Sequence, residues 1–142
     1  MADWKNSLRS ALDETRQTQH EKESTQMTRF LDDVVMPAFA ELRDELEEHG
    51  REVVLRRADT TATLIVHYGG EEEITYRIQS RTFPNSIVPF ADIRYRERKG
   101  LKFVRAESMF RSGKPDYSIE DVTRDEVIQN FLKQYLPRVQ RD

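Results

Sequence analysis

Residues 27–49 read MTRFLDDVVMPAFAELRDELEEH, and this stretch decides how the rest of the chain folds. Its apolar residues recur at steps of three and four, which places them on one side of a helix. They are Met27, Phe30, Leu31, Val34, Val35, Ala38, Leu42 and Leu46, with Phe39 beside them. Gly50 follows as a stop signal, because glycine adopts the left-handed conformation that closes a helix at little steric cost. This helix offers the apolar surface against which downstream strands can pack.

Pro37 lies inside the predicted helix. Proline lacks the N–H that would bond the carbonyl of Asp33, and its ring crowds that carbonyl. We therefore expect a kink at Pro37, or two helical pieces that meet at Val35 and Met36.

Composition favours one globular domain. The chain has 142 residues, of which 37% are hydrophobic and 35% charged, and it contains no cysteine. The absence of cysteine excludes disulfides and cysteine metal sites and fits a cytoplasmic location. Residues 1–13 lack the apolar core of a signal peptide, and no run approaches the roughly 20 apolar residues of a membrane span. We expect a soluble cytoplasmic protein that does not enter a membrane.

Residues 1–24 are predicted to be a polar N-terminal extension, with a single domain over residues 25–142. The extension carries a thin helical stripe, formed by Trp4, Leu8, Ala11, Leu12 and Thr15. So narrow a stripe gains little from burial on its own. Two interpretations stay open: a loosely ordered, solvated extension, or an arm that becomes ordered against a second subunit or a partner.

Three runs after Gly50 alternate between apolar and polar residues, as strands do. They cover residues 52–57, 61–68 and 73–79, and the links between them are short enough for an antiparallel meander. One face of this meander is apolar, while the other carries hydroxyl, amide and guanidinium groups, as in a sheet covered by helices on one side.

Residues 81–92 do not alternate, and Pro84 and Pro89 interrupt any ladder. We expect this segment to fold over a sheet edge or to join an apolar interface. The candidate apolar interface residues are Phe83, Ile87 and Phe90, together with Trp4, Leu8 and Leu12 of the extension.

Two further strands are predicted at residues 91–98 and 101–110, turning at Lys99 and Gly100. A last helix follows, where Thr123 and Glu126 have the spacing of a capping box and Pro137 follows the helix end. The predicted fold class is α+β: a two-layer sandwich with a long N-terminal helix, a five-strand antiparallel meander and a C-terminal helix. This order of elements occurs in several unrelated small folds, including cystatin-like and secretion-chaperone-like ones, and fold-level analogy does not define function.

Charge is distributed unevenly along the chain. Residues 13–52 hold twelve acids and five bases, whereas residues 81–114 hold nine bases and three acids. With a two-residue turn at Lys99 and Gly100, the basic hairpin would oppose Arg94 with Arg105, Arg96 with Phe103 and Arg98 with Leu101, all on one face. Guanidinium groups beside an aromatic ring can bind carboxylates or phosphates.

Three interpretations of this arginine face stay open: a solvated strand face that discourages edge aggregation, a surface for a protein partner, or a nucleic-acid surface. The candidate partner-binding residues are Arg94, Arg96, Arg98, Phe103 and Arg105, together with the acidic helix end at Glu41, Asp44, Glu45 and Glu48. Pairing between these two sets is awkward within one chain, because they should lie on opposite sides of the sheet. The same pairing between two chains is possible.

No residue pattern indicates catalysis. His20, His49 and His67 stand in different segments without the converging ligands that a metal needs, and the carboxylates show no paired arrangement for acid–base chemistry. We expect no enzyme, no metal and no cofactor. The leading hypothesis is a non-catalytic protein-binding or adaptor domain that forms a homodimer. The alternatives are a single-stranded nucleic-acid binder using the hairpin at residues 93–106, and a small-ligand site between helix and sheet with Tyr68 and Tyr76 as polar tips.

Overall fold

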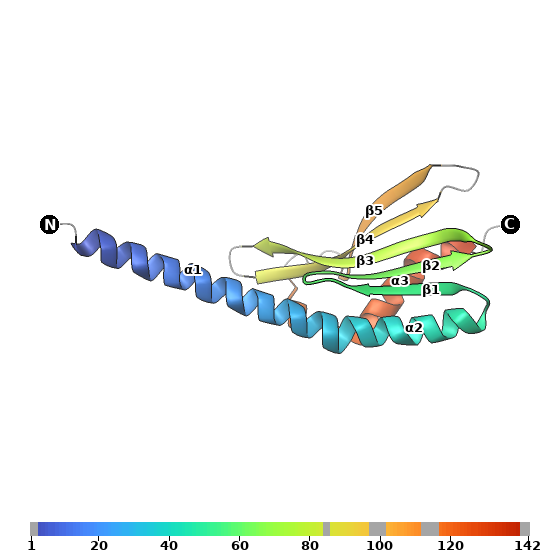
Figure 1. The fold of residues 1–142 in the computed structure, drawn as a ribbon, viewed down its shortest axis with the longest axis horizontal. Helices are drawn as coiled ribbons and strands as arrows, with labels where there is room; N and C mark the ends of the chain where they lie inside the picture. The colour runs from blue at the N-terminus through green and yellow to red at the C-terminus, as the bar shows by residue number, and fades with distance from the viewer. Residues whose placement is uncertain (1–2, 84–85, 97–101, 112–116, 140–142) are drawn as a thin grey trace.

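The protein is an α+β fold in which helices cover one face of a five-stranded antiparallel sheet (Figure 1). The structure is a computed structural model that describes residues 3–83, 86–96, 102–111 and 117–139. Its helices are α1 (Asp3–Phe30), α2 (Met36–Glu48) and α3 (Arg124–Val139), with a π-helical turn at Leu31–Val35 and a 3₁₀ turn at Ile119–Asp121. Its strands are β1 (Glu52–Arg57), β2 (Ala62–Tyr68), β3 (Glu71–Phe83), β4 (Ser86–Arg96) and β5 (Phe103–Met109). Each strand pairs with the next in order β1 to β5, which confirms the predicted meander.

The long helical region is divided between Val35 and Met36, which is one of the two outcomes expected from Pro37. The N–H of Met36 bonds the carbonyl of Leu31 five residues back, which is the geometry of a π-bulge. Pro37 then falls in the first turn of α2, directly after this π-helical turn. Two helical pieces therefore meet at Val35 and Met36.

Gly50 ends α2 as expected. Its φ is +79°, its N–H bonds the carbonyl of Glu47, and the N–H of Arg51 bonds the carbonyl of Leu46. These two bonds form a Schellman motif, which requires a left-handed residue at this position.

The first helix is much longer than the stretch that begins at residue 27. It starts at Asp3 and runs unbroken to Phe30, and its outer part projects beyond the sheet (Figure 1). The polar residues 16–25 continue the helix because they include neither glycine nor proline and are rich in glutamine, glutamate, arginine and lysine, which favour helix. The side chain of Gln19 also donates to Glu23 one turn later, at 2.9 Å.

The core lies between the sheet and the helices α2 and α3. Tyr76 of β3 sits at its centre, with its ring edge-on to Phe39 of α2 at 6.0 Å and to Phe131 of α3 at 5.3 Å. Its hydroxyl donates to Oδ1 of the buried Asn130 at 2.5 Å, and Asn130 in turn donates to Ser108 Oγ at 2.9 Å. This chain of contacts holds α3 to the middle of the sheet.

The segment around residues 81–92 is a correction to the prediction. It forms the far end of a long β3–β4 hairpin, in which Ser80 pairs with Pro89 and Phe83 with Ser86. Pro89 is tolerated because its carbonyl points away from β3 and accepts from the Tyr117 hydroxyl at 2.5 Å. The nitrogen of a strand residue points to the same side as its carbonyl, and the β4–β5 pairing begins only at Phe90, so the missing N–H interrupts no ladder.

The C-terminal helix begins as predicted and ends later. The N–H of Thr123 donates to Glu126 Oε1 at 3.3 Å and the N–H of Glu126 donates to Thr123 Oγ1 at 3.2 Å, which completes the capping box. Pro137, however, lies within α3, and the helix continues to Val139. Pro137 is exposed in the last turn, where water can bond the carbonyl that the ring leaves without a donor.

Candidate binding surfaces

The basic hairpin has the register that the sequence predicts. Arg94 pairs with Arg105 and Arg96 with Phe103 across β4 and β5. Arg94 and Arg105 are exposed on the face of the sheet away from the helices. Ile93, which directly precedes Arg94 in β4, faces the other way and is buried in the core. The predicted pair of Arg98 and Leu101 lies outside the residues that the structure describes.

Arginines on this outer face have acidic partners from their own sheet. Arg94 Nη2 lies 3.1 Å from Glu72 Oε1, and Arg105 Nη2 lies 2.6 Å from Asp92 Oδ2. The two carboxylates are mostly buried, with side-chain exposures of 16% and 12%. The positive charges of Arg94 and Arg105 are therefore partly neutralised. The sequence interpretation did not include these two ion pairs.

Phe103 is the aromatic element of this face. The guanidinium carbons of Arg94 and Arg96 lie 4.8 and 5.0 Å from the centre of its ring, within cation–π range. The ring thus packs with arginines of its own chain, so that a flat ligand would have to displace them to stack on it.

A hollow of about 310 Å³ opens in the middle of the outer face. Two neighbouring rows of paired residues surround it, one through Arg56, Thr63, Arg77 and Asp92 and one through Ile65, Thr75, Arg94 and Arg105. Arg56 and Arg77 were not among the sequence candidates. The alternation of the strands put Thr63, Thr75 and Arg77 on the polar face, but only the full set of registers brings them beside Arg56.

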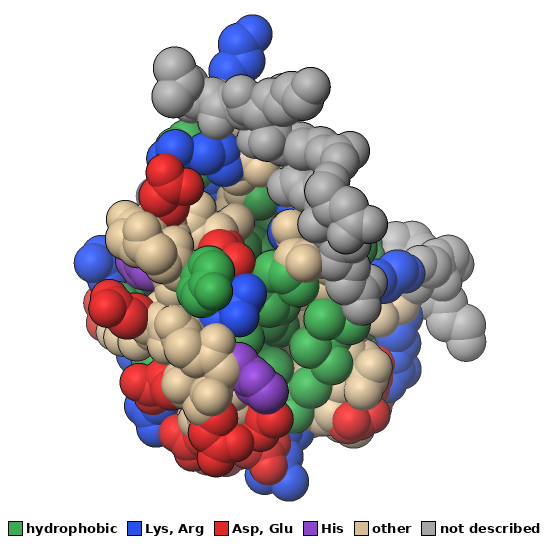
Figure 2. All heavy atoms as spheres, turned by 90° about the vertical axis from the view of Figure 1, so that its right-hand side faces the viewer, with side chains coloured by type: hydrophobic (Ala, Val, Ile, Leu, Met, Phe, Trp, Pro, Cys, Tyr) green, Lys and Arg blue, Asp and Glu red, His purple; other side chains and the backbone are tan. Residues whose placement is uncertain are grey.

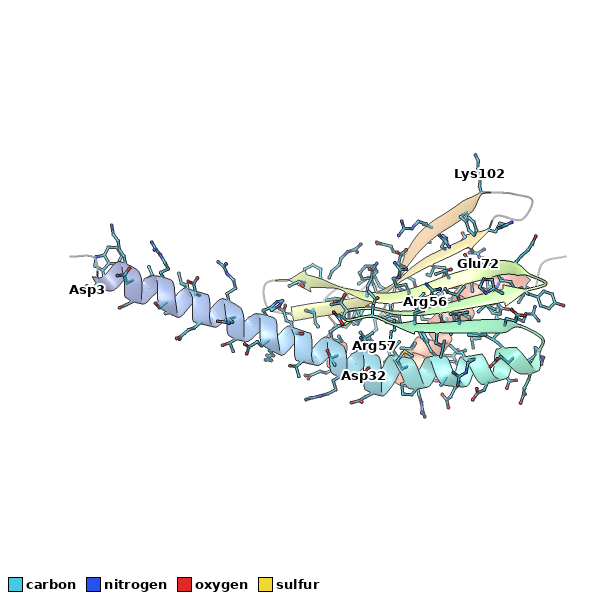
Figure 3. All side chains as sticks on the ribbon, viewed as in Figure 1. Asp3, Asp32, Arg56, Arg57, Glu72 and Lys102 are labelled. Atoms are coloured by element: carbon cyan, nitrogen blue, oxygen red, sulfur yellow. The ribbon has the colours of Figure 1, made fainter. Side chains whose placement is uncertain are left out.

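Two neighbouring arginines of β1, Arg56 and Arg57, lie on opposite faces of the sheet; Figure 3 labels both. Arg57 lies on the helix side, where its Nε donates to Asp32 Oδ1 of the π-helical turn at 2.9 Å. Arg56 lies on the outer side, at the edge of the hollow. Arg77 donates to Thr63 Oγ1 at 3.2 Å. Neither Arg56 nor Arg77 forms a salt bridge within the described ranges.

The acidic end of α2 lies on the helix side of the molecule, as the periodicity predicts. Its ion pairs lie on the helix side: Asp44 with Arg43 at 3.4 Å and Glu45 with His49 at 3.3 Å within the α2 region, and Glu41 with Arg124 of α3 at 3.5 Å. These acidic side chains are exposed for the most part, and exposed pairs of this kind stabilise the fold little.

Beside this acidic end, α2 and α3 form an apolar groove of about 240 Å³. Figure 2 faces this end of the molecule and shows hydrophobic side chains beside a gathering of acidic ones. Its apolar lining consists of Leu42, Leu46, Phe131, Leu132, Tyr135, Leu136 and Val139. Three polar residues also line it: Glu45, His49 and Arg51.

A hydrogen-bonded trio fixes one side of the groove. The Tyr135 hydroxyl donates to Glu73 Oε1 at 2.6 Å, and Arg51 Nε donates to the same oxygen at 3.3 Å. Burial, followed by the hydrogen bond to Glu73, raises the pKa of Tyr135. Its hydroxyl thus keeps its proton and remains a donor, which locks α3 to the start of β3.

The candidate apolar interface residues fall into two groups. Trp4, Leu8 and Leu12 are 63%, 52% and 58% exposed on the projecting part of α1, and Phe83 is exposed at the tip of the β3–β4 hairpin. Ile87 and Phe90 are a correction, because both are buried within the monomer. Ile87 joins the core cluster, and the Arg81 guanidinium lies over the Phe90 ring at 4.2 Å.

The residues considered for metal or small-ligand chemistry do not converge. His20 lies on α1, His49 at the end of α2 and His67 on β2, and no group of three or more potential metal ligands occurs among the residues placed by the structure. Tyr76 is closed in the core by Asn130, whereas Tyr68 is exposed with its ring under Arg51. Within the described ranges, no helix has the length and apolar character needed to cross a membrane.

Comparison with known proteins identifies no relative: no family model, curated protein or solved structure matches this chain.

Proposed function

We propose that this chain is a non-catalytic protein-interaction domain that assembles as a homodimer. The observation that carries the proposal is the outer part of α1, which projects beyond the sheet and exposes Trp4, Leu8 and Leu12 (Figure 1). These residues recur every four positions, so they lie within an arc of about 80° on one side of the helix. Apolar side chains gathered on an otherwise polar surface are typical of interaction sites.

A second copy of the chain supplies a suitable partner surface. The helices α1 and α2 lie nearly end to end (Figure 1). The stripe of Trp4, Leu8 and Leu12 belongs to the first turns of α1, and the apolar groove lies beside the last turns of α2. Two copies placed antiparallel would bring the stripe of each to the groove of the other. Such an arrangement forms the same contact twice about a two-fold axis, as most homodimers do.

Charge favours the same arrangement. Residues 3–12 hold two bases, Lys5 and Arg9, and one acid, whereas residues 41–48 hold five acids and one base. The basic segment of one copy would therefore lie along the acidic end of α2 in the other. The proposal joins the candidate residues Trp4, Leu8 and Leu12 with Glu41, Asp44, Glu45 and Glu48 in one interface.

Light scattering coupled to size-exclusion chromatography tests the proposal. The full chain should have twice its monomer mass of 16.8 kDa, and a Trp4→Ala/Leu8→Ala/Leu12→Ala variant should return to the monomer mass. The matched control is Asn6→Ala/Ser10→Ala/Gln17→Ala on the opposite side of the same helix, which should stay dimeric. A full chain that is monomeric at every concentration would reject the proposal, and so would a control variant that dissociates equally.

The sequence alternatives have weaker support. Single-stranded nucleic-acid binding through Arg94, Arg96, Arg98, Arg105 and Phe103 needs free cations and an open ring, whereas Arg94 and Arg105 pair with Glu72 and Asp92. A small-ligand site using Tyr76 needs its hydroxyl, which Asn130 occupies. The lack of cysteine supports a cytoplasmic location as part of the proposal.

A further inference from the structure

From the outer face of the sheet we infer that its central hollow binds a compact phosphate-bearing anion, such as inorganic pyrophosphate or the phosphate end of a small metabolite. This inference does not depend on self-association. The hollow lies on the opposite side of the sheet from α2 and α3, whereas the proposed dimer contact uses the helices.

The charge around the hollow is positive. Four arginines line it, at positions 56, 77, 94 and 105, against a single carboxylate, that of Asp92. Counting Glu72, which bonds Arg94, the group still holds four positive and two negative charges. Four like charges gathered on one sheet face repel one another unless anions compensate them. Glu72 and Asp92 form ion pairs with Arg94 and Arg105, and Asp92 is also the cross-strand neighbour of Arg77. Within the described ranges, Arg56 and Arg77 are the lining arginines without a salt bridge, so an added anion would compensate their charge.

The chemistry of the lining suits phosphate oxygens. Guanidinium groups present paired N–H donors that match phosphate in a two-pronged geometry. The floor adds the hydroxyl of Thr75, whose Oγ1 is shielded from solvent and has no hydrogen-bond partner among the described residues. Buried polar atoms normally have a partner, so the Thr75 hydroxyl is a donor left over at the floor of the hollow, which a rotation of its side chain would have to bring to an anion.

The size and borders of the hollow favour a small anion over a polymer. Its volume of about 310 Å³ lies at the lower end of the range for small-molecule sites. Carboxylates stand next to it at Glu72 and Asp92, and Glu107 follows Asp92 in the same row. Of these carboxylates only Asp92 lines the hollow, so a compact anion would meet fewer negative charges than a nucleic-acid strand that continued past it.

Isothermal titration calorimetry of the full chain at low salt tests the inference, with inorganic phosphate, pyrophosphate and a single-stranded DNA oligonucleotide as probes. Pyrophosphate should bind once per chain and more tightly than phosphate, because its higher charge engages more of the arginines. Arg56→Gln/Arg77→Gln should weaken pyrophosphate binding roughly tenfold or more, since charge-assisted hydrogen bonds are about twice as strong as neutral ones.

Two further variants make the result specific. Arg81→Gln removes one positive charge from the same face but away from the hollow, at a residue paired with Glu107 at 2.7 Å, and it should change the affinity less than about twofold. Asp92→Asn should tighten binding, because it frees Arg105 and removes a negative charge from the lining. Circular dichroism spectra identical to that of the wild type show that each variant is folded.

Three results would overturn the inference. They are no saturable binding of pyrophosphate at millimolar concentration, an equal loss of affinity in Arg81→Gln, and binding of the oligonucleotide without binding of pyrophosphate. The last result would favour a nucleic-acid surface instead. Because the masses from light scattering are measured separately, a failure here leaves the dimer proposal standing, and the reverse holds as well.

Discussion

Removing the Tyr76 hydroxyl isolates the contact that holds α3 to the sheet. In Tyr76→Phe the ring keeps its edge-on packing with Phe39 and Phe131, because phenylalanine has the same shape apart from the hydroxyl. Asn130 Oδ1, however, loses a donor at 2.5 Å in a residue that is only 8% exposed. The variant therefore loses a hydrogen bond without gaining a substantial cavity.

The expected cost follows from that geometry. Leaving a buried acceptor without its donor destabilises a fold by about 1–3 kcal/mol. For a domain of this size, such a loss lowers Tm by roughly 3–10 °C. The slope of unfolding against urea should not change, because the surface exposed on unfolding is the same.

Urea titration followed by far-ultraviolet circular dichroism measures this loss. Tryptophan fluorescence would be a poor reporter, because Trp4 is exposed on the outer part of α1. Tyr68→Phe is the matched control: the chemical change is the same, but Tyr68 is exposed, and we expect a change within about 0.5 kcal/mol. A Tyr76→Phe loss no larger than that of the control would refute our account of how α3 is held.

Two other substitutions test the ends of helices. The hydrogen bonds from Arg111 lower the pKa of Glu126 below its ordinary value of 4.5, so the stability contributed by this carboxylate is complete above that pH and is lost as the pH falls through the lowered pKa. Glu126→Gln should thus be less stable than the wild type in urea at neutral pH, with a difference that shrinks as the pH falls below 4.5; a difference that grows in acid would contradict the assignment. Gly50→Ala should cost about 1–2 kcal/mol, because φ is +79° there, and Gly50→Asn should cost less, since asparagine tolerates that conformation better. Equal thermal stability of Gly50→Ala and the wild type would show that the turn does not need a left-handed residue.

The features that could be predicted from sequence depend on neighbours in the chain. The alternation of residues 52–57 and 61–68, the glycine stop at residue 50 and the capping box from Thr123 to Glu126 each involve residues a few positions apart. The pairing of Arg94 with Arg105 belongs to the same group, because a short turn sets the register of a hairpin.

The features that could not be predicted depend on distant parts of the chain. The strand through Pro89 is possible because Tyr117, nearly thirty residues later, bonds its carbonyl. The thin stripe at residues 4–15 indicated helix in the extension, but the polar residues 16–25 have no apolar period that would show the helix continuing unbroken to Phe30.

The candidate sites show the same division. The outward direction of Arg94 and Arg105 could be predicted, but their ion pairs with Glu72 and Asp92 could not, since these depend on side-chain conformations across three strands. The hollow beside Arg56 likewise requires the registers of every strand pair in the sheet.

Hydrogen exchange in α1 tests the central claim most directly. A projecting helix with little buried surface opens easily on its own, so the amides of residues 3–24 should exchange quickly in a monomer. If this segment docks on a second copy, their protection should rise as the protein concentration is raised, while protection of the core strand β3 should stay constant. Fast exchange of residues 3–24 at every concentration would contradict the claim that α1 is the contact element of a homodimer.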